Sequence, residues 1–360
     1  MRATVEAQAF YEAMKKLSEV PRKFSIPALE NICVYFSNGA CTLMATDLET
    51  WMIAKLPASG DDFSFVFQNS ANVIRACRYY EGRLELELCG KDSDLRLTMR
   101  SNGKYGEFPV SSSEMFPEAP STTPKQRYQS SAKDLYRRSR CVKYAAAASQ
   151  DKPSLAGIRF EDHRMWCMNG CRAAVNRDEA LRVERPFIVP ANALALLRTL
   201  GDANVEIGVG ERYISFSAGI YTIYSRLLEE TRYYELDTAW PQTCKENYSV
   251  DRREFLDAIK YLSEFAGKVR APAVFDSGRI SLRGSDSHFS VQISVDGTCD
   301  ILYGFNLDYM KEALEQLADS DVIRIGVTSS ISPIVLTGEQ NNSALVLPVR
   351  LKAQPLRKAA

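Results

Sequence analysis

One pattern occurs six times along the 360 residues of this chain: a short apolar strand, a helix of about three turns, and two or three strands of alternating polarity. Internal repetition constrains a fold more than local propensity does, because each repeat buries its apolar face against its neighbours. The chain is also too long for one ordinary core. The repeats therefore predict an α+β protein in which helices cover one face of antiparallel sheets.

The six repeats pair into three domains. We predict their helices near residues 7–17, 71–79, 132–147, 191–200, 252–265 and 307–318. Two helix starts are supported by a capping side chain three residues before a carboxylate, Ser131 before Asp134 and Asp251 before Glu254. The joints fall at polar or proline-containing stretches, residues 117–126 and 240–246. The predicted divisions are domain I at 1–124, domain II at 125–245, domain III at 246–352 and a C-terminal tail at 353–360.

Composition and cysteine usage indicate a cytoplasmic protein. The sequence has neither a signal-peptide pattern at its start nor a run of about 18 apolar residues, so we expect no secretion and no membrane partner. Its nine cysteines are odd in number and scattered, which favours reduced, mostly buried thiols. Lysine plus arginine and aspartate plus glutamate balance at 45 each, so any DNA-binding surface depends on how the charges are distributed.

The helix predicted at residues 132–147 carries the most informative charge pattern. At 100° per residue, Lys133, Arg137, Arg140 and Tyr144 form one stripe, while apolar residues such as Leu135 lie nearly opposite. Any single helix of this kind is more often an ordinary solvated face. Recurrence on the other helices favours function instead; the matching cations are Lys15, Lys16, Arg75, Arg78, Arg198, Arg253 and Lys260.

A ring with these helices inside would have a positive channel although the protein is neutral. Such a channel attracts phosphates without reading sequence. Contacts of this kind allow sliding, since no base-specific hydrogen bond is broken at each step. Retention on the nucleic acid would then be topological.

Four motifs in order resemble one family across the whole chain. They are ATDLET at residues 45–50, MFPEAP at 115–120, GFNLDYM at 304–310 and LVLPVRL at 345–351. Their order and spacing resemble the bacterial DNA polymerase III beta subunit, the beta sliding clamp. The resemblance implies the three-domain DNA clamp fold, with two chains closing head to tail into a homodimeric ring whose helices line the pore. The implied function is a processivity factor that a clamp loader places on double-stranded DNA, where it tethers DNA polymerases and other replication or repair proteins.

The resemblance also assigns residues by position. For DNA contact it gives Arg22 or Lys23 and Gln150; together with the helical cations of the charge pattern, the DNA-binding set comprises Arg22, Lys23, Arg75, Arg78, Lys133, Arg137, Arg140, Gln150 and Arg198. The dimer interface comprises Phe108, Tyr261 and Leu262. The client-peptide pocket comprises Lys152, Leu155, Met168, Gly170, Arg172, Asn306, Tyr309, Ile331, Pro333, Leu345, Val346, Leu347, Pro348, Val349 and Arg350. Such a pocket binds aromatic or aliphatic anchors on an apolar floor.

The chain departs from the family pattern at two places beside this pocket. Where the family has Thr-Asp-Gly-His-Arg-Leu, residues 168–173 read Met-Asn-Gly-Cys-Arg-Ala, which bears on peptide preference. The chain also continues past the usual Arg-Leu end with the basic tail KAQPLRKAA. These departures keep open an alternative function, a clamp-like scaffold of a mobile element that acts outside the main replication fork.

Catalytic and cofactor chemistry is not indicated. His163 and His288 are far apart in sequence, and Cys167 with Cys171 lacks a second cysteine pair, so we expect no metal site. GVGER at residues 208–212 is typical of a hairpin turn rather than a nucleotide loop. Asp47 and Glu49 leave a metal-dependent nucleic-acid enzyme as a remote alternative. We expect no catalytic residues and no cofactor.

Overall fold

The computed structural model describes residues 1–20, 27–90, 94–148, 153–229, 235–267, 272–283, 287–339 and 341–351. The chain divides into two compact units, Met1–Tyr136 with Asn192–Leu227, and Arg137–Ala191 with Leu228–Ala360. These units do not coincide with the three predicted domains, whose boundaries stay a prediction. Strands β9 and β17 nevertheless begin at Gln126 and Glu246, the last residues of the two predicted joints.

Repeats one and two hold the first eight strands. Repeat one consists of β1 (Arg2–Glu6), α1 (Ala7–Leu17), β2 (Cys33–Ser37), β3 (Ala40–Thr46) and β4 (Thr50–Gly60), with a 3₁₀ turn η1 at Pro27–Glu30. Repeat two consists of β5 (Phe63–Phe67), α2 (Ser70–Cys77), β6 (Arg83–Cys89), β7 (Arg96–Ser101) and β8 (Lys104–Ser111).

Repeats three and four follow the same order. Repeat three consists of β9 (Gln126–Ser131), α3 (Ala132–Lys143), η3 (Pro153–Ala156), β10 (Gly157–Glu161), β11 (Arg164–Met168) and β12 (Arg172–Arg177). Repeat four consists of β13 (Phe187–Pro190), η4 (Ala193–Leu200), β14 (Asn204–Val209), β15 (Tyr213–Ala218) and β16 (Tyr221–Arg226).

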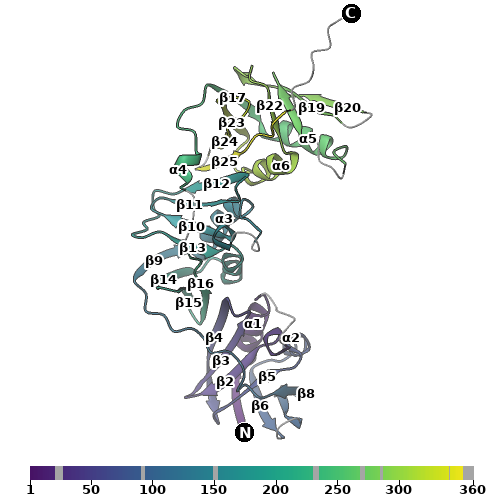
Figure 1. Cartoon of the computed structure of the whole chain (residues 1–360). Coiled ribbons are helices and arrows are strands. Elements are labelled where there is room, and N and C mark those ends of the chain that lie inside the picture. The colour runs from purple at the N-terminus through teal and green to yellow at the C-terminus, as the bar shows by residue number, and fades with distance from the viewer. Residues whose placement is uncertain are drawn as a thin grey trace, which may run out of the picture. The chain divides into compact units, whose positions relative to one another are not determined.

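Repeats five and six complete the described chain, after a short helix α4 at Leu236–Ala239. Repeat five consists of β17 (Glu246–Asp251), α5 (Arg252–Ser263), β18 (Ala273–Asp276), β19 (Arg279–Arg283) and β20 (His288–Gln292), followed by the short β21 (Asp296–Gly297). Repeat six consists of β22 (Tyr303–Phe305), α6 (Leu307–Gln316), β23 (Val322–Val327), β24 (Ile334–Thr337) and β25 (Asn342–Val346). All six predicted repeats are therefore confirmed as strand, helix and three strands (Figure 1).

The predicted helix caps form hydrogen bonds. The Glu254 amide donates to Asp251 Oδ1 at 2.8 Å, and the Asp134 amide donates to Ser131 Oγ at 3.4 Å. The helix expected at residues 191–200 is instead the 3₁₀ segment η4 at Ala193–Leu200. The 208–212 segment is the predicted hairpin turn, closed by the Gly210 amide on the Tyr213 carbonyl at 2.9 Å.

Three antiparallel sheets confirm the predicted α+β class. The first has the order β1-β6-β7-β8-β5-β2-β3-β4-β16-β15-β14-β9, the second β13-β10-β11-β12-β25-β24-β23-β17-β21, and the third β20-β19-β18-β22. Two of these sheets run continuously from one repeat into another through their last strands. β4 of repeat one pairs with β16 of repeat four, and β12 of repeat three pairs with β25 of repeat six. Each junction thus joins a repeat to the one three places further along.

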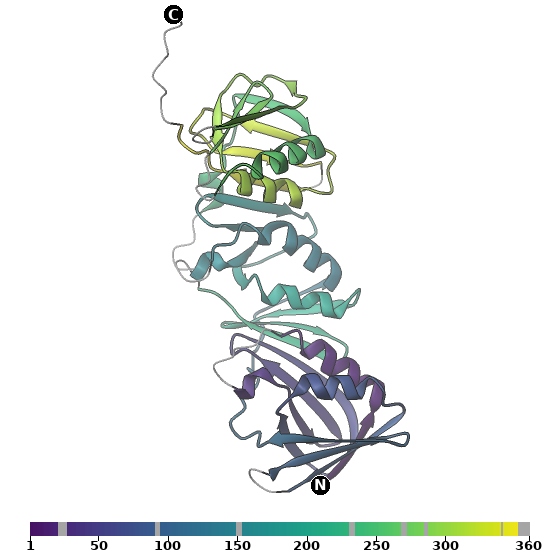
Figure 2. The same ribbon diagram turned by 90° about the vertical axis from the view of Figure 1, so that its right-hand side faces the viewer.

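Helices lie in pairs on these sheets. Within their own units, α1 contacts α2 and α5 contacts α6, and each pair lies side by side in Figure 2. The apolar stripe of α1, including Phe10, Met14 and Leu17, is buried against the strands, as its helical spacing requires. None of the helices in the described ranges is long and apolar enough to cross a membrane.

The cysteines are less uniformly buried than expected. All nine are free thiols, but only Cys33, Cys41, Cys77 and Cys167 are buried, while Cys89 and Cys171 are exposed. The expectation of mostly buried thiols was therefore wrong. Burial raises the pKa of the Cys33 and Cys77 thiols to about 12, so these two are protonated at neutral pH.

Candidate functional site

Several residues assigned to the client-peptide pocket lie next to one another in the second unit. Asn306 caps α6 by accepting hydrogen bonds from the amides of Asp308 (2.9 Å) and Tyr309 (3.2 Å). The segment after β25 is fixed at both ends: the Leu347 amide donates to the Cys171 carbonyl at 2.9 Å, and the Val349 amide donates to the Gly304 carbonyl at 2.8 Å. The start of β12, the start of α6 and the C-terminal segment are thereby held next to one another.

The residues assigned to the pocket differ in burial. Leu155, Met168 and Leu345 belong to one small apolar core. Ile331 and Leu347 are 68% and 39% exposed, unusual values for large aliphatic side chains. An apolar anchor that covered them would gain the free energy of that surface. Lys152 lies outside the described residues.

Arg172 is the most constrained charged group of this cluster. Its guanidinium lies 4.6 Å from the ring centre of Tyr309 and 5.3 Å from that of Tyr144. It pairs with Glu312 and donates to the Tyr144 carbonyl at 2.5 Å. Its side chain is only 10% exposed, so the charge is held in place by its neighbours. Tyr309 is consequently oriented at the rim by the stacked arginine.

Gly304 lets the C-terminal segment pass over β22. A Cβ atom at this position would lie 2.6 Å from Leu351 Cδ2 and 2.8 Å from the Val349 carbonyl oxygen. The close approach explains why glycine is required between Tyr303 and Phe305, which are both buried. The path of residues 347–350 therefore depends on the absence of a side chain at position 304.

The predicted DNA-binding cations that the structure describes are exposed on helices, but several have carboxylate partners. Lys133 Nζ lies 2.9 Å from Asp202, Arg137 lies 3.6 Å from Asp319, and Arg198 pairs with Glu19. Arg75, Arg78 and Arg140 are exposed as well. Arg22, Lys23 and Gln150 lie outside the described residues. The net positive charge of these faces is thus smaller than the count of cations suggests.

Tyr144 does not belong to the cationic stripe. The prediction extended the third helix to residue 147, whereas α3 ends at Lys143. Past that end the backbone no longer follows 100° per residue, and the Tyr144 ring packs beside Arg172. Tyr144 therefore lies with a residue assigned to the client-peptide pocket rather than with the predicted DNA-binding cations.

The dimer residues need one correction. Leu262 is 0% exposed and lies in the core formed by α5, α6 and their strands, so its side chain is not available at the surface. Tyr261 is 46% exposed, and Phe108 on β8 is half-buried, so both stay predictions. Sequence reasoning missed Phe265, which is 41% exposed and stacks on Phe289 with ring centres 3.9 Å apart. Its spacing of four residues from Tyr261 was a usable signal.

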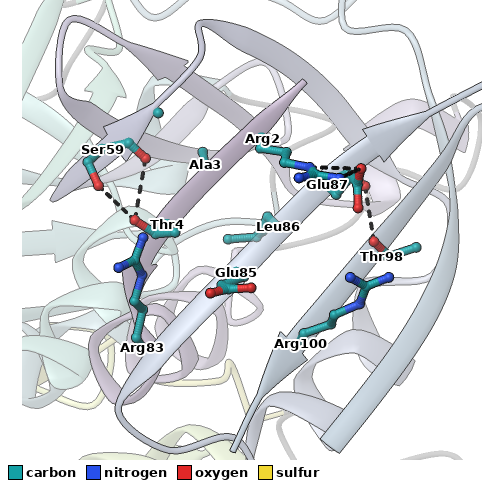
Figure 3. Close-up of a pocket in the computed structure, with 11 residues that line it drawn as sticks. Arg2, Ala3, Thr4, Ser59, Arg83, Glu85, Leu86, Glu87, Thr98 and Arg100 are labelled. Carbon is teal, nitrogen blue, oxygen red and sulfur yellow. Dashed lines mark hydrogen bonds and ion pairs between the residues drawn. The ribbon is translucent and has the colours of Figure 1, made fainter. Parts of the chain in front are cut away.

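A charged hollow of about 310 Å³ lies on the solvent face of β1, β6 and β7 (Figure 3). Arg2 pairs with Glu87 at 2.8 Å, and Arg83, Glu85 and Arg100 line the remainder. Exposed pairs of this kind contribute about 0–1 kcal/mol. No residue assigned from the sequence lies in the hollow.

Asp47, one of the two carboxylates that suggested a nuclease, has a structural role. Asp47 Oδ1 accepts hydrogen bonds from the amides of Glu49 (3.0 Å) and Thr50 (2.7 Å), which closes the turn between β3 and β4. Within the described ranges, no group of three or more histidine, cysteine, aspartate or glutamate side chains is arranged to hold a metal ion. Asp47 is therefore explained without a metal.

Comparison with known proteins identifies the fold. No protein-family model matches the chain. Curated relatives match over nearly its whole length: the beta sliding clamp of Salmonella typhimurium is 22% identical over 378 residues, covering 98% of this chain and 100% of the relative, and that of Lactococcus lactis is 20% identical over 387 residues, covering 97% and 99%. The chain is a distant, full-length homologue of the bacterial beta sliding clamps.

Solved structures support the same conclusion at the level of fold. The DNA polymerase sliding clamp of Bacillus subtilis superposes with a TM-score of 0.84 at 20% identity, covering 98% of this chain and 100% of that one. A putative DNA polymerase III beta subunit from Eubacterium rectale gives 0.86 at 18% identity, covering 97% and 99%. The clamp fold therefore extends over the whole chain. The beta clamp family is non-catalytic, which agrees with the expectation from the sequence.

Proposed function

We propose that this chain is a DNA sliding clamp, which encircles duplex DNA as a head-to-tail homodimer and tethers polymerases and other replication proteins to it. The main support for a closed ring is the pairing between the last strands of different repeats. Repeats one and four join through β4 and β16, and repeats three and six join through β12 and β25. Repeats two and five are the pair that this rule leaves over.

The last strands of repeats two and five each have an edge that is not fully paired. In the described part of the chain, β20 pairs with β19 alone. β8 pairs with β7 along Lys104–Pro109 and with β5 only through Val110 and Ser111. An unpaired strand edge is a template for pairing with another chain. Joining β8 of one protomer to β20 of its partner, twice, closes a ring with two-fold symmetry.

Exposed aromatic residues lie beside β20, the strand at the edge of the third sheet. Phe289 on β20 stacks on Phe265, and the Tyr261 ring centre lies 5.1 Å from that of Phe265. Burial of such side chains is a common source of interface free energy. This cluster supports the proposed interface together with Phe108 on β8.

The mass of the protein in solution tests whether two chains form the proposed ring. We expect the unmodified chain to sediment at about twice 40.4 kDa at micromolar concentration. The double variant Tyr261→Asp/Phe265→Asp should raise the dimer Kd at least about tenfold, because it places two carboxylates in an apolar contact. Ile220→Asp, an exposed aliphatic position in the β15–β16 turn, is the matched control. A monomeric unmodified chain would contradict the ring.

The exposed helical cations support contact with DNA phosphates. Lys133, Arg137, Arg140 and Arg198 lie on α3 and η4, where phosphate contacts would carry no sequence information. Since three of the four have an acidic partner, we infer that affinity for DNA is modest and that retention rests on encirclement.

The cluster around Arg172 supports the tethering role. Its buried apolar floor, exposed aliphatic rim and fixed guanidinium suit a short linear peptide with one apolar anchor. We propose that replication proteins bind there through such a segment. The Met168–Ala173 departure from the family pattern makes the preferred anchor specific to this chain.

A further inference from the structure

Both junctions between repeats carry an ion pair of the same design. At the junction of repeats one and four, Arg198 of η4 pairs with Glu19, which follows α1. At the junction of repeats three and six, Arg137 of α3 pairs at 3.6 Å with Asp319, which follows α6. In each case an arginine on one helix reaches an acid just past the end of the helix in the joined repeat.

The arginines occupy equivalent positions. Both are the sixth residue of their helix, and in both helices the first, fourth and eighth residues are buried. Helix α2 of repeat two has the same burial pattern, at Ser70, Val73 and Cys77, and its sixth residue is Arg75. Arg75 therefore points to solvent as the third member of this set.

The acids are equivalent too. Glu19 comes two residues after Leu17, the last buried residue of its helical stripe, and Asp319 comes two residues after the buried Leu317. In repeat five the corresponding buried residue is Leu262, and two residues later stands Glu264. Arginine and acid thus belong to repeats two and five, whose last strands join no last strand of another repeat in the described part of the chain.

We propose that Arg75 of one protomer forms an ion pair with Glu264 of the other, at each of the two interfaces of the ring. The inference rests on the proposed head-to-tail dimer and extends it to a specific contact. Both side chains are exposed. Within the described ranges Glu264 has no ion pair, and Arg75 donates only to the Asn72 side chain of its own helix. An ion pair between the two protomers gives Arg75 and Glu264 each the kind of partner that the equivalent arginines and acids have at the other junctions.

Charge reversal tests this contact. Arg75→Glu and Glu264→Arg should each raise the dimer Kd by about tenfold or more at low salt, because like charges then meet at both interfaces. An equimolar mixture of the two variants should dimerise with the affinity of the unmodified chain, since both interfaces of the mixed ring carry opposite charges. The doubly reversed chain should also recover. Salt at about 1 M should reduce the differences.

Arg78→Glu is the matched control, because it makes the same charge change three residues further along, at the residue that follows α2. If the unmodified chain dimerises and neither single variant differs from Arg78→Glu, the ion pair is wrong and the ring stands. Loss of dimer in both variants without recovery in their mixture also contradicts the pair. A monomeric unmodified chain contradicts the proposed function itself.

Discussion

Replacing Leu262 by alanine lowers the free energy of unfolding by about 3 kcal/mol in our account, because it leaves a cavity in a close-packed core. Leu262 is 0% exposed and shares its core with Ile259, Phe275 and Phe305. Ile220 is 38% exposed and lies outside the proposed interface, so Ile220→Ala should cost less than about 1 kcal/mol and is the matched control.

Urea denaturation at one fixed protomer concentration measures both effects, because dimerisation makes apparent stability depend on concentration. The expected result is a lower midpoint for Leu262→Ala with a nearly unchanged midpoint for Ile220→Ala. Loss of dimer in Leu262→Ala without any loss of protomer stability would restore the original assignment of Leu262 to the interface.

Replacing Gly304 by valine should weaken peptide binding at least about thirtyfold, which corresponds to about 2 kcal/mol. The new side chain would collide with Leu351 Cδ2 and with the Val349 carbonyl oxygen, and a backbone atom can give way only by moving the segment. That segment includes Leu347, Pro348 and Val349, the rim of the proposed pocket.

The measurement is fluorescence anisotropy with a labelled peptide carrying the clamp-binding segment of the host's own replicative polymerase. Leu351→Ala is the control, since it removes the contacting side chain without displacing the Val349 backbone; we expect less than a threefold change, below about 1 kcal/mol. Equal affinities for Gly304→Val and the unmodified chain would show that the rim is not part of the site. A ring that never binds this peptide would favour the scaffold alternative.

Periodicity was sufficient to predict the repeats. Helix α1 has the bounds expected from its apolar spacing, and α5 begins at the expected residue because Asp251 caps it. The 3₁₀ geometry of η4 could not be predicted, since ALALLRTL has an apolar spacing that suits either kind of helix. The sequence also did not indicate which repeats join through their last strands, because that pairing depends on contacts between residues far apart in sequence.

The sequence indicated which types of residue the candidate site contains but not how they are arranged in space. Positions 261 and 262 differ by one residue and by 100° around α5, and that rotation decides which of them is buried. The acids that pair with Lys133, Arg137 and Arg198 follow the ends of other helices, so the sequence indicated more positive charge than these faces have. The stacking of Arg172 beside Tyr144 and Tyr309 likewise required the fold.

Encirclement of DNA is the central claim, and retention on circular DNA tests it most directly. The chain is loaded onto a nicked circle by the cognate loader with ATP, separated from unbound protein, and followed before and after the circle is cut with a restriction enzyme. We predict retention on the closed circle and release within minutes of cutting, at a salt concentration at which linear DNA binds none of the protein. Equal, salt-sensitive loss from circular and linear DNA would contradict the ring and indicate an ordinary surface binder.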